Sequence, residues 1–382
     1  MFAVVQTVMS ILYIIKMLLT VVEACFAVVA LLYATLIAVL LFGFRRASRQ
    51  RDCNGAKTSV SIILPFRNEE GNIPRVLESL LSQSIDADFE IVAVDDHSTD
   101  GSCEAVANIQ KTDRRLRLLY ADGQGKKNAL LTGIRSARNN IIVTVDADCH
   151  YPARWLDTMV STFEQNDCDL LAGPVIVNPV NGWFRKFQFV DFASLVGSGI
   201  GAYGIGHPIM CNGANVMFSR DAVMNLDDPF NSAFSSGDDV FLLHKIKADN
   251  GKVCFTAQSD AMVETRPVES VGAFVRQRMR WGGKTTGYRD VDSWLVALVV
   301  AFMSMCFCAS LIILPFSIIP FVVVYLSKLL IDTVFLTCVC GCFGNRKFLW
   351  WMPLFEVMVS LYTVVVTAMA VIRPQGASWK RA

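Results

Sequence analysis

The chain has 382 residues, with 35 Lys and Arg against 34 Asp and Glu and a formal net charge of +1. This balance lacks the basic excess of a nucleic-acid-binding protein, so no nucleic-acid partner is expected. The mean hydropathy of +0.42 and the hydrophobic content of 53% are high for a soluble protein. We therefore expect one large soluble domain together with membrane segments.

The apolar residues gather towards the two ends of the chain. The first run, Phe2–Phe42, is too long for a secretory signal and lacks a basic start. Val22–Phe42 is long enough to cross a bilayer, and residues 1–19 could form a second span or lie on the membrane surface. Residues 1–44 are thus expected to hold one or two membrane helices. In the linker that follows, residues 45–58, four arginines favour a cytoplasmic position: Arg45, Arg46, Arg49 and Arg51.

Residues 59–270 have the mixed composition of a globular domain. Short apolar runs alternate with segments of helical spacing, which predicts a doubly wound, mostly parallel sheet of the α/β class. The expected strands are Ser59–Leu64, Phe89–Val94, Leu116–Tyr120 and Ile141–Val145. The expected helices are Ile73–Leu81, Ser102–Ile109 and Asn128–Ala137.

Aspartates follow two of the expected strands, at Asp95 and Asp96 and again at Asp146 and Asp148. In open parallel sheets, ligands bind beyond the carboxyl ends of the strands. Residues i and i+2 of an extended segment point the same way, so Asp146 and Asp148 could share one ion. Hard oxygen ligands favour Mg²⁺ or Mn²⁺, which also bind substrate phosphates. The alternative is an ordinary turn, where aspartate is common.

Two further polar motifs come later in the domain. Asp238 and Asp239 precede an amphipathic helix, and could be either site residues or helix caps. In "RQRMRWGGK" four basic residues surround Trp281, namely Arg276, Arg278, Arg280 and Lys284. Such a segment suits the membrane surface, and arginine forks also suit phosphate oxygens. Residues 271–292 are therefore expected to form an amphipathic interface segment.

About three C-terminal spans are expected within residues 293–373, near Trp294–Leu314, Phe316–Val339 and Trp351–Ile372, before a tail of residues 374–382. Two crossings would leave Arg346 and Lys347 in the cytoplasm. A third crossing would put the basic residues Arg373, Lys380 and Arg381 outside, against the positive-inside rule. The helix count is left open by this conflict.

The 12 cysteines are scattered, and a cytoplasmic domain is expected to keep its thiols reduced. Cys338, Cys340 and Cys342 alternate at a membrane edge. Their spacing fits no common zinc site, so small or acylated residues near the end of a span are the favoured interpretation.

The order of the motifs resembles that of the membrane-embedded family 2 glycosyltransferases, which include cellulose, hyaluronan and poly-N-acetylglucosamine synthases and ceramide glucosyltransferase. "SIILPFRNEE" is similar to their first strand and nucleotide-binding loop, "VDDHSTDGS" to their first aspartate motif and "DAD" to their Asp-x-Asp. "SGDD" is similar to their acceptor-side acidic motif, and Gln277, Arg280 and Trp281 match Gln-x-x-Arg-Trp. The resemblance covers Ser59 to about Trp281 and the flanking spans.

The resemblance implies an inverting enzyme of GT-A fold that uses a nucleotide sugar, usually a UDP-sugar, and Mg²⁺ or Mn²⁺. It assigns Asp239 as the general base with Asp238 beside it, and Asp146 and Asp148 to the ribose, diphosphate and metal. The other nucleotide-side residues it implies are Pro65, Arg67, Glu69, Asp95, Asp96, and Lys126 or Lys127. On the diphosphate and acceptor side it implies Gln277, Arg280, Trp281 and the loop residues Cys211, Asn212 and Gly213, although that loop could be a plain turn and strand.

Some positions depart from the family pattern. His97 stands where the family commonly has Gly, and Cys149 and His150 follow the Asp-x-Asp. His150 could be a further metal ligand or a surface residue. "GWFRKFQFVDF" is expected to be packing rather than a sugar platform.

The expected activity is transfer to a lipid or growing glycan acceptor by an integral protein of the plasma or inner membrane. A processive polysaccharide synthase and a non-catalytic transport or receptor component are the alternatives.

Overall fold

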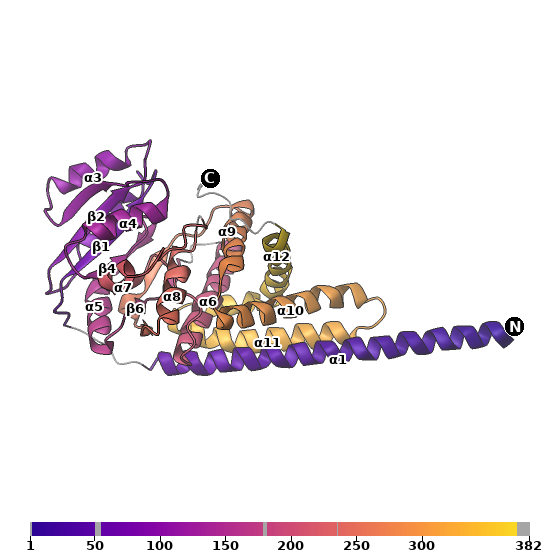
Figure 1. Cartoon of the computed structure of the whole chain (residues 1–382). Helices are drawn as coiled ribbons and strands as arrows, with labels where there is room; N and C mark the ends of the chain where they lie inside the picture. The colour runs from indigo at the N-terminus through magenta and orange to yellow at the C-terminus, as the bar shows by residue number, and fades with distance from the viewer. Residues whose placement is uncertain (1, 50–54, 179–181, 235, 373–382) are drawn as a thin grey trace.

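The computed structural model describes residues 2–49, 55–178, 182–234 and 236–372. Figure 1 shows an α/β domain at one end of the molecule and a group of long helices at the other. Arg51, Arg373 and the tail 374–382, which the sequence analysis singled out, lie outside the described residues.

The central sheet has seven strands in the order β3-β2-β1-β4-β8-β6-β9. The first four strands are parallel, as predicted, while β8 is antiparallel to both its neighbours. The two inner strands β1 and β4 are wholly buried, because their apolar runs are covered on both faces. The bounds are β1 Val60–Phe66, β2 Phe89–Asp95, β3 Leu116–Tyr120, β4 Ile141–Thr144, β6 Leu170–Ala172, β8 Val216–Ser219 and β9 Val253–Phe255.

A second, small sheet has the order β5-β10-β7. Its first strand in the chain, β5, directly follows the Asp-x-Asp motif. Its strands are β5 Cys149–His150, β7 Val175–Val177 and β10 Val263–Thr265. His150 pairs with Glu264 of β10, and the histidine is exposed. It is therefore a surface residue at the edge of the sheet.

The helices of the domain begin close to where the periodicity predicts them. They are α2 Ile73–Leu81, α3 Ser102–Gln110, α4 Lys126–Ser136, α5 Trp155–Asn166, α7 Arg220–Met224 and α8 Asp238–Ala248, with a 3-10 turn at Ser259–Ala261. The helix expected from Asn128 begins instead at Lys126, so both lysines stand in the first turn of α4. Gly133 lets α4 lie close to the sheet, since a Cβ there would come within 2.6 Å of Ile63.

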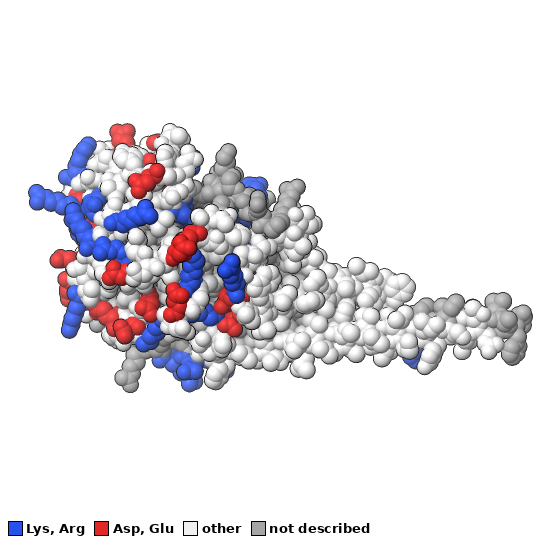
Figure 2. Space-filling view, viewed as in Figure 1, with Lys and Arg blue, Asp and Glu red and all other residues white. Residues whose placement is uncertain are grey.

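Among the described residues, four helices are long and apolar enough to cross a membrane. They are α1 Phe2–Ala47, α10 Val291–Ile313, α11 Ile319–Cys342 and α12 Met352–Ile372, the last preceded by a 3-10 turn at Arg346–Trp351. Residues 2–47 form a single helix rather than two. In Figure 2 the charged side chains gather on the α/β domain, and the helical part is almost uncharged on this face. The chain thus has the make-up of an integral membrane protein.

Two more helices, α6 Trp183–Gly204 and α9 Val271–Gly283, run across α1, α10 and α11 where the domain meets them (Figure 1). Gly201 of α6 lies against α1 so closely that a Cβ would come within 2.3 Å of the Leu40 carbonyl oxygen. Phe187 and Phe189 of α6 are buried, so the aromatic run is packing, as predicted.

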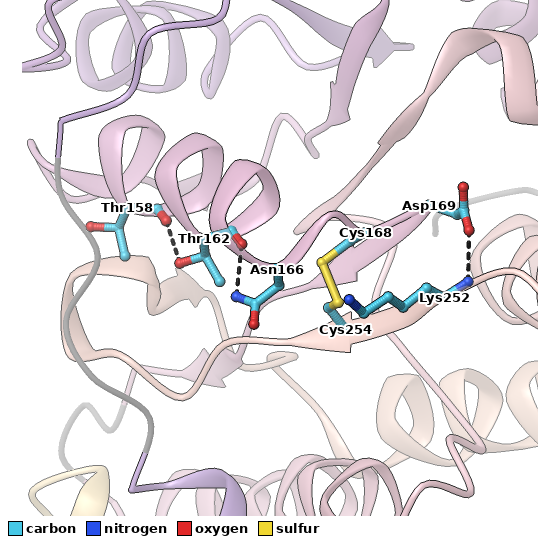
Figure 3. Close-up of a disulfide and its surroundings, with 7 residues drawn as sticks. All are labelled: Thr158, Thr162, Asn166, Cys168, Asp169, Lys252 and Cys254. Carbon is cyan, nitrogen blue, oxygen red and sulfur yellow. Dashed lines mark hydrogen bonds between the residues drawn. A yellow bond between two sulfur atoms is a disulfide. The ribbon is translucent and has the colours of Figure 1, made fainter.

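A disulfide joins Cys168, just before β6, to Cys254 in the edge strand β9 (Figure 3). The expectation that the domain keeps its thiols reduced is therefore wrong for this pair. The sequence could not reveal it, because the two residues are 86 positions apart and meet only when β9 pairs with β6. The nine other described cysteines are free.

We predict that Cys168→Ser lowers the free energy of unfolding by about 2–4 kcal/mol, because a cross-link over a long loop restricts the unfolded chain. Thermal unfolding with and without reductant measures the effect, and Cys103→Ser, a change at a free cysteine, is the matched control. Reductant should lower the midpoint of the wild-type protein and leave that of Cys168→Ser unchanged. A wild-type midpoint that is insensitive to reductant contradicts the prediction.

Candidate active site

The loops after β1 and β2 are fastened to each other at the carboxyl edge of the sheet. The backbone N–H groups of Asn68 and Glu69 donate to Ser98 Oγ at 3.0 Å and Ser102 Oγ at 2.8 Å. Pro65, near the end of β1, pairs in register with Val94 of β2. The Ser/Thr-rich turn therefore serves to fix the loop that carries Arg67 and Glu69.

The first aspartate pair lies beneath these loops. Asp95 accepts from the Ser98 N–H at 3.1 Å. Asp96 is fully buried; its Oδ1 accepts from the Gly125 N–H at 2.7 Å, and its Oδ2 lies 3.6 Å from the Arg67 guanidinium. Within the described residues, this Oδ2 atom accepts no hydrogen bond. A buried acceptor of this kind suits a donor group on a ligand.

His97 has a φ of 58°, in the left-handed region that glycine adopts most easily. This conformation explains why a glycine is common at the position in the resembled family. The turn is kept here with a histidine whose Nδ1 lies 3.5 Å from Asp96 Oδ1.

Asp146 and Asp238 are brought together by a half-buried lysine. Lys126 Nζ donates to Asp146 Oδ1 at 2.8 Å and lies 3.7 Å from Asp238 Oδ2. Burial alone would lower the pKa of Lys126, but the two carboxylates raise it above its ordinary value. Lys126 is therefore a fixed positive charge between the end of β4 and the start of α8.

Asp239 stands in the first turn of α8, held by donors from three segments. It accepts from the Val240 N–H at 2.8 Å and the Gly213 N–H at 3.1 Å, and Lys284 Nζ lies 3.4 Å away. Burial would raise its pKa, but the Lys284 charge and these hydrogen bonds hold the pKa below its ordinary value. Asp239 is therefore ionised at neutral pH.

The expected acceptor loop lies beside Asp239. Cys211 Sγ contacts the Asp239 carbonyl oxygen at 3.3 Å, and Asn212 Oδ1 accepts from the Ala214 N–H at 3.1 Å. A small pocket opens here, lined by Leu130, Thr144, Gly213, Val216, Phe218, Phe230, Asp238, Asp239 and Leu242. The loop is thus a turn that also forms one wall of the site.

Lys127 does not join its neighbour at the site. Its Nζ donates to three backbone carbonyl oxygens, those of Phe230, Asn231 and Phe234, at 2.6–2.7 Å. Burial lowers its pKa. Of the two lysines expected near the nucleotide, Lys126 is therefore the better candidate, because the Lys127 ammonium group is committed to the loop before α8.

The Gln-x-x-Arg-Trp motif lies on α9. Gln277 Oε1 accepts from Arg278 at 3.2 Å, Trp281 packs against Phe192 of α6, and Arg280 is half-buried. The buried arginine of this helix is Arg278, which pairs with Asp191 of α6. Arg278, inside the motif, therefore serves to hold α9 against α6. The roles of Gln277, Arg280 and Trp281 remain predictions.

Lys284 is a candidate site residue that the sequence assignment did not include. It follows α9 directly, at the start of the 3-10 turn Lys284–Gly287, and only the fold brings it to Asp239. The one sequence signal was its place at the end of the basic stretch "RQRMRWGGK".

We predict that Lys284→Met moves the acidic limb of the pH–activity profile to higher pH. The ammonium lowers the pKa of Asp239, so its removal raises that pKa, and the ionised base is then lost at a higher pH. The profile of kcat/KM against pH measures the shift. Lys284→Arg should keep the wild-type limb, and Lys252→Met, at an exposed lysine, is the matched control. An unchanged limb in Lys284→Met contradicts the prediction.

The far end of α8 is anchored to the start of α10. Lys247 Nζ donates to Asp290 Oδ1 and Asp292 Oδ2, both at 2.6 Å, and His244 Nε2 lies 3.0 Å from Ser293 Oγ. The helix that carries Asp239 is therefore fixed directly to an apolar helix long enough to span a membrane.

A divalent ion is implied by the Asp-x-Asp. Within the described ranges, no group of three or more His, Cys, Asp or Glu side chains is arranged to hold a metal. Asp146 and Asp148 are both half-buried, and Asp146 pairs with Lys126. Such a small donor set fits Mg²⁺ or Mn²⁺, which take one or two carboxylates and complete their shell with water and substrate phosphate.

The fold and the site define an α/β enzyme domain that presents paired carboxylates at a sheet edge next to a membrane. Residues 61–226 match the family "Glycosyl transferase family 2". This match and the glycosyltransferase relatives confirm the predicted class of enzyme, and the similarity to family 2 lies within residues 61–226.

Two similar proteins are also named as sugar transferases. The glycosyltransferase AglE of Haloferax volcanii is 26% identical over 226 residues, which are 58% of this chain and 71% of AglE. The undecaprenyl-phosphate 4-deoxy-4-formamido-L-arabinose transferase of Proteus mirabilis is 28% identical over 154 residues, or 38% of this chain and 46% of that protein.

A solved structure is similar over nearly the whole chain. The mannosyltransferase PcManGT from Pyrobaculum calidifontis, in complex with GDP-Man and Mn²⁺, aligns with a TM-score of 0.56. The alignment covers 91% of this chain and 98% of that chain at 18% identity. At this identity the likeness shows the fold, which confirms the predicted GT-A class.

Proposed function

We propose that this protein transfers a sugar from a nucleotide-sugar donor to a lipid acceptor at the face of the membrane. The observation that carries the proposal is the meeting of Asp146, Asp238 and Asp239 at one edge of the sheet, with Lys126 between the first two. Lys284, beside Asp239, directly follows α9, and the far end of α8 is anchored to the start of α10. The reacting groups therefore lie near the apolar helices, where a membrane lipid can present its head group.

The donor side would consist of the β1 and β2 loops and the end of β4. Arg67 and the buried Asp96 supply a cation and a free acceptor atom for the nucleoside, and Lys126 supplies positive charge near the diphosphate. A divalent ion on Asp146 and Asp148 would offset the charge that the leaving diphosphate gains. The solved structure of the mannosyltransferase PcManGT, which holds GDP-Man and Mn²⁺, supports such a donor and ion.

The reaction forms a bond between an acceptor oxygen and the anomeric carbon and breaks the bond from that carbon to the diphosphate oxygen. With a hydroxyl acceptor, the proton passes to Asp239, which is ionised and lies beside the pocket. With a phosphate acceptor, the attacking oxygen is already an anion, and Lys126 and Lys284 would orient it. The undecaprenyl-phosphate transferase among the relatives supports a lipid-linked acceptor.

We prefer transfer of one sugar to a lipid over processive synthesis, which would also require the spans to move a polymer. Among the described residues only four apolar helices have spanning length, a modest number for that task. We further propose that the catalytic domain faces the cytoplasm of a plasma or inner membrane. Arg45 and Arg46 support this, since they lie in the last turn of α1, on the domain side.

The experiment is a donor panel of UDP-sugars and GDP-mannose, tested on the purified protein with polyprenyl phosphate and with neutral glycolipid acceptors. Released nucleoside diphosphate and the mass of the lipid product are the two readouts. One donor should release its diphosphate only with Mg²⁺ or Mn²⁺ and add a single sugar to the lipid.

Two results contradict the proposal. A ladder of long products supports the processive alternative. If no donor is transferred or hydrolysed, the result supports a non-catalytic membrane component.

A further inference from the structure

The helix α12 has the length and composition of a membrane span. It packs against α10 and also against α9, which leads directly into the site residue Lys284. In Figure 1, α12 runs across α1, α10 and α11. In this it resembles α6 and α9, which also cross those helices. The question is whether α12 crosses the bilayer or stays at the face that carries the catalytic domain.

The contacts of α12 follow it along most of its length. Near its start, Phe355 packs on Phe187 of α6, with ring centroids 5.3 Å apart. In its middle, Tyr362 donates a hydrogen bond to Asp191 of α6 and lies 5.5 Å from the Phe274 ring of α9. Past the middle, α12 lies against Gly282 of α9, where a Cβ would come within 2.6 Å of Val366.

These contacts fix the depth of α12. Gly282 is two residues before Lys284, whose ammonium lies 3.4 Å from Asp239, so this part of α9 borders the active site. From Phe355 to Val366 a helix rises by about 16 Å, roughly half the hydrocarbon thickness of a bilayer. A crossing helix would have left the level of α9 over that rise, whereas α12 is still in contact with it.

The start of α12 is held in place by a buried polar cluster. Lys328 of α11 donates to Glu356 of α12 and, at 2.6 Å, to Asp332. Tyr33 of α1 donates to the same aspartate at 2.8 Å. Buried charges are stable in an apolar surrounding only when paired, so this cluster fixes α12 against the two helices that run lengthwise.

We infer that α12 lies in the membrane leaflet next to the catalytic domain without crossing the bilayer, and that its outward face binds lipid acyl chains. That face carries four exposed apolar residues, which are Leu354, Leu361, Val365 and Ile372. The three spanning helices are then α1, α10 and α11.

The charges of the sequence agree with this arrangement. After the domain the chain crosses the membrane twice, through α10 and α11, and so returns to the catalytic side. The basic residues Arg373, Lys380 and Arg381 then come after a helix that stays on the side of Arg45 and Arg46. The conflict with the positive-inside rule, which three C-terminal crossings create, disappears.

Sealed membrane vesicles of known orientation test the inference in the full-length protein. An epitope is added after Ala382 in one variant and between α10 and α11, within residues 314–318, in another. Protease is then added from the catalytic side. The C-terminal epitope should be cut together with the catalytic domain, and the epitope between α10 and α11 should be protected. A protected C-terminal epitope in vesicles whose catalytic domain is cut overturns the inference.

A second measurement tests the lipid face itself. A photoreactive amino acid at Leu361, which is 46% exposed, should capture labelled lipid on irradiation. The same group at Val366, which faces Gly282 of α9, should instead cross-link within the protein. Capture of lipid at Val366 but not at Leu361 overturns the assignment of faces. Both measurements are independent of catalytic activity, so they stand apart from the proposed function.

Discussion

Asp239→Asn is expected to lower the rate of sugar transfer by about 10²–10⁴-fold, the usual contribution of a general base. The amide keeps the size of the side chain, and its single oxygen can still accept from one of the two N–H groups, that of Gly213 or that of Val240, which bond to different carboxylate oxygens in the wild type. The amide cannot take a proton from an acceptor hydroxyl. Initial rates at saturating donor measure the loss, and binding of the donor should be almost unchanged.

Asp249→Asn is the matched control for this variant. It makes the same change at the other end of α8, at an exposed residue remote from the pocket. Its activity should equal that of the wild type. Full activity in Asp239→Asn with a phosphate acceptor, and none with a hydroxyl acceptor, would show that Asp239 acts as a base only where a proton must be removed. Full activity with both acceptors rejects Asp239 as the base.

Asp148→Asn is expected to weaken binding of Mn²⁺ and to lower the transfer rate by about 10²-fold or more. A neutral amide replaces one of the two carboxylates of the Asp-x-Asp, and the ion offsets charge on the leaving diphosphate. Electron paramagnetic resonance of added Mn²⁺, with the nucleoside diphosphate present, measures binding without relying on activity.

The control for Asp148 is Asp167→Asn, at an exposed residue with a φ of 48° that asparagine tolerates as well as aspartate. It should bind Mn²⁺ as the wild type does. If Asp148→Asn also binds Mn²⁺ normally and transfers sugar at the wild-type rate, the ion does not use this carboxylate.

Local patterns determined the elements of the catalytic domain. Ile73–Leu81 and Leu116–Tyr120 have the bounds that the spacing predicts, because periodicity and chain breaks are encoded over a few residues. The aspartates at the ends of β2 and β4 could also be placed at one sheet edge, since parallel strands bring their carboxyl ends together.

The partners of those aspartates came from the tertiary structure. Lys126 and Lys127 are neighbours in the sequence, but in the first turn of α4 they point to different groups, Asp146 and the Phe230–Phe234 loop. The approach of Lys284 to Asp239 and the disulfide between Cys168 and Cys254 likewise join distant segments. No short-range pattern carries such information.

The sequence by itself determined that the chain has an α/β domain with paired carboxylates between apolar segments of spanning length. Hydropathy measures how apolar a helix is but not which way it runs, so α12 has the composition of a span. Only the tertiary structure decided its direction, because the contacts of Phe355, Tyr362 and Val366 with α6 and α9 keep it beside the catalytic domain.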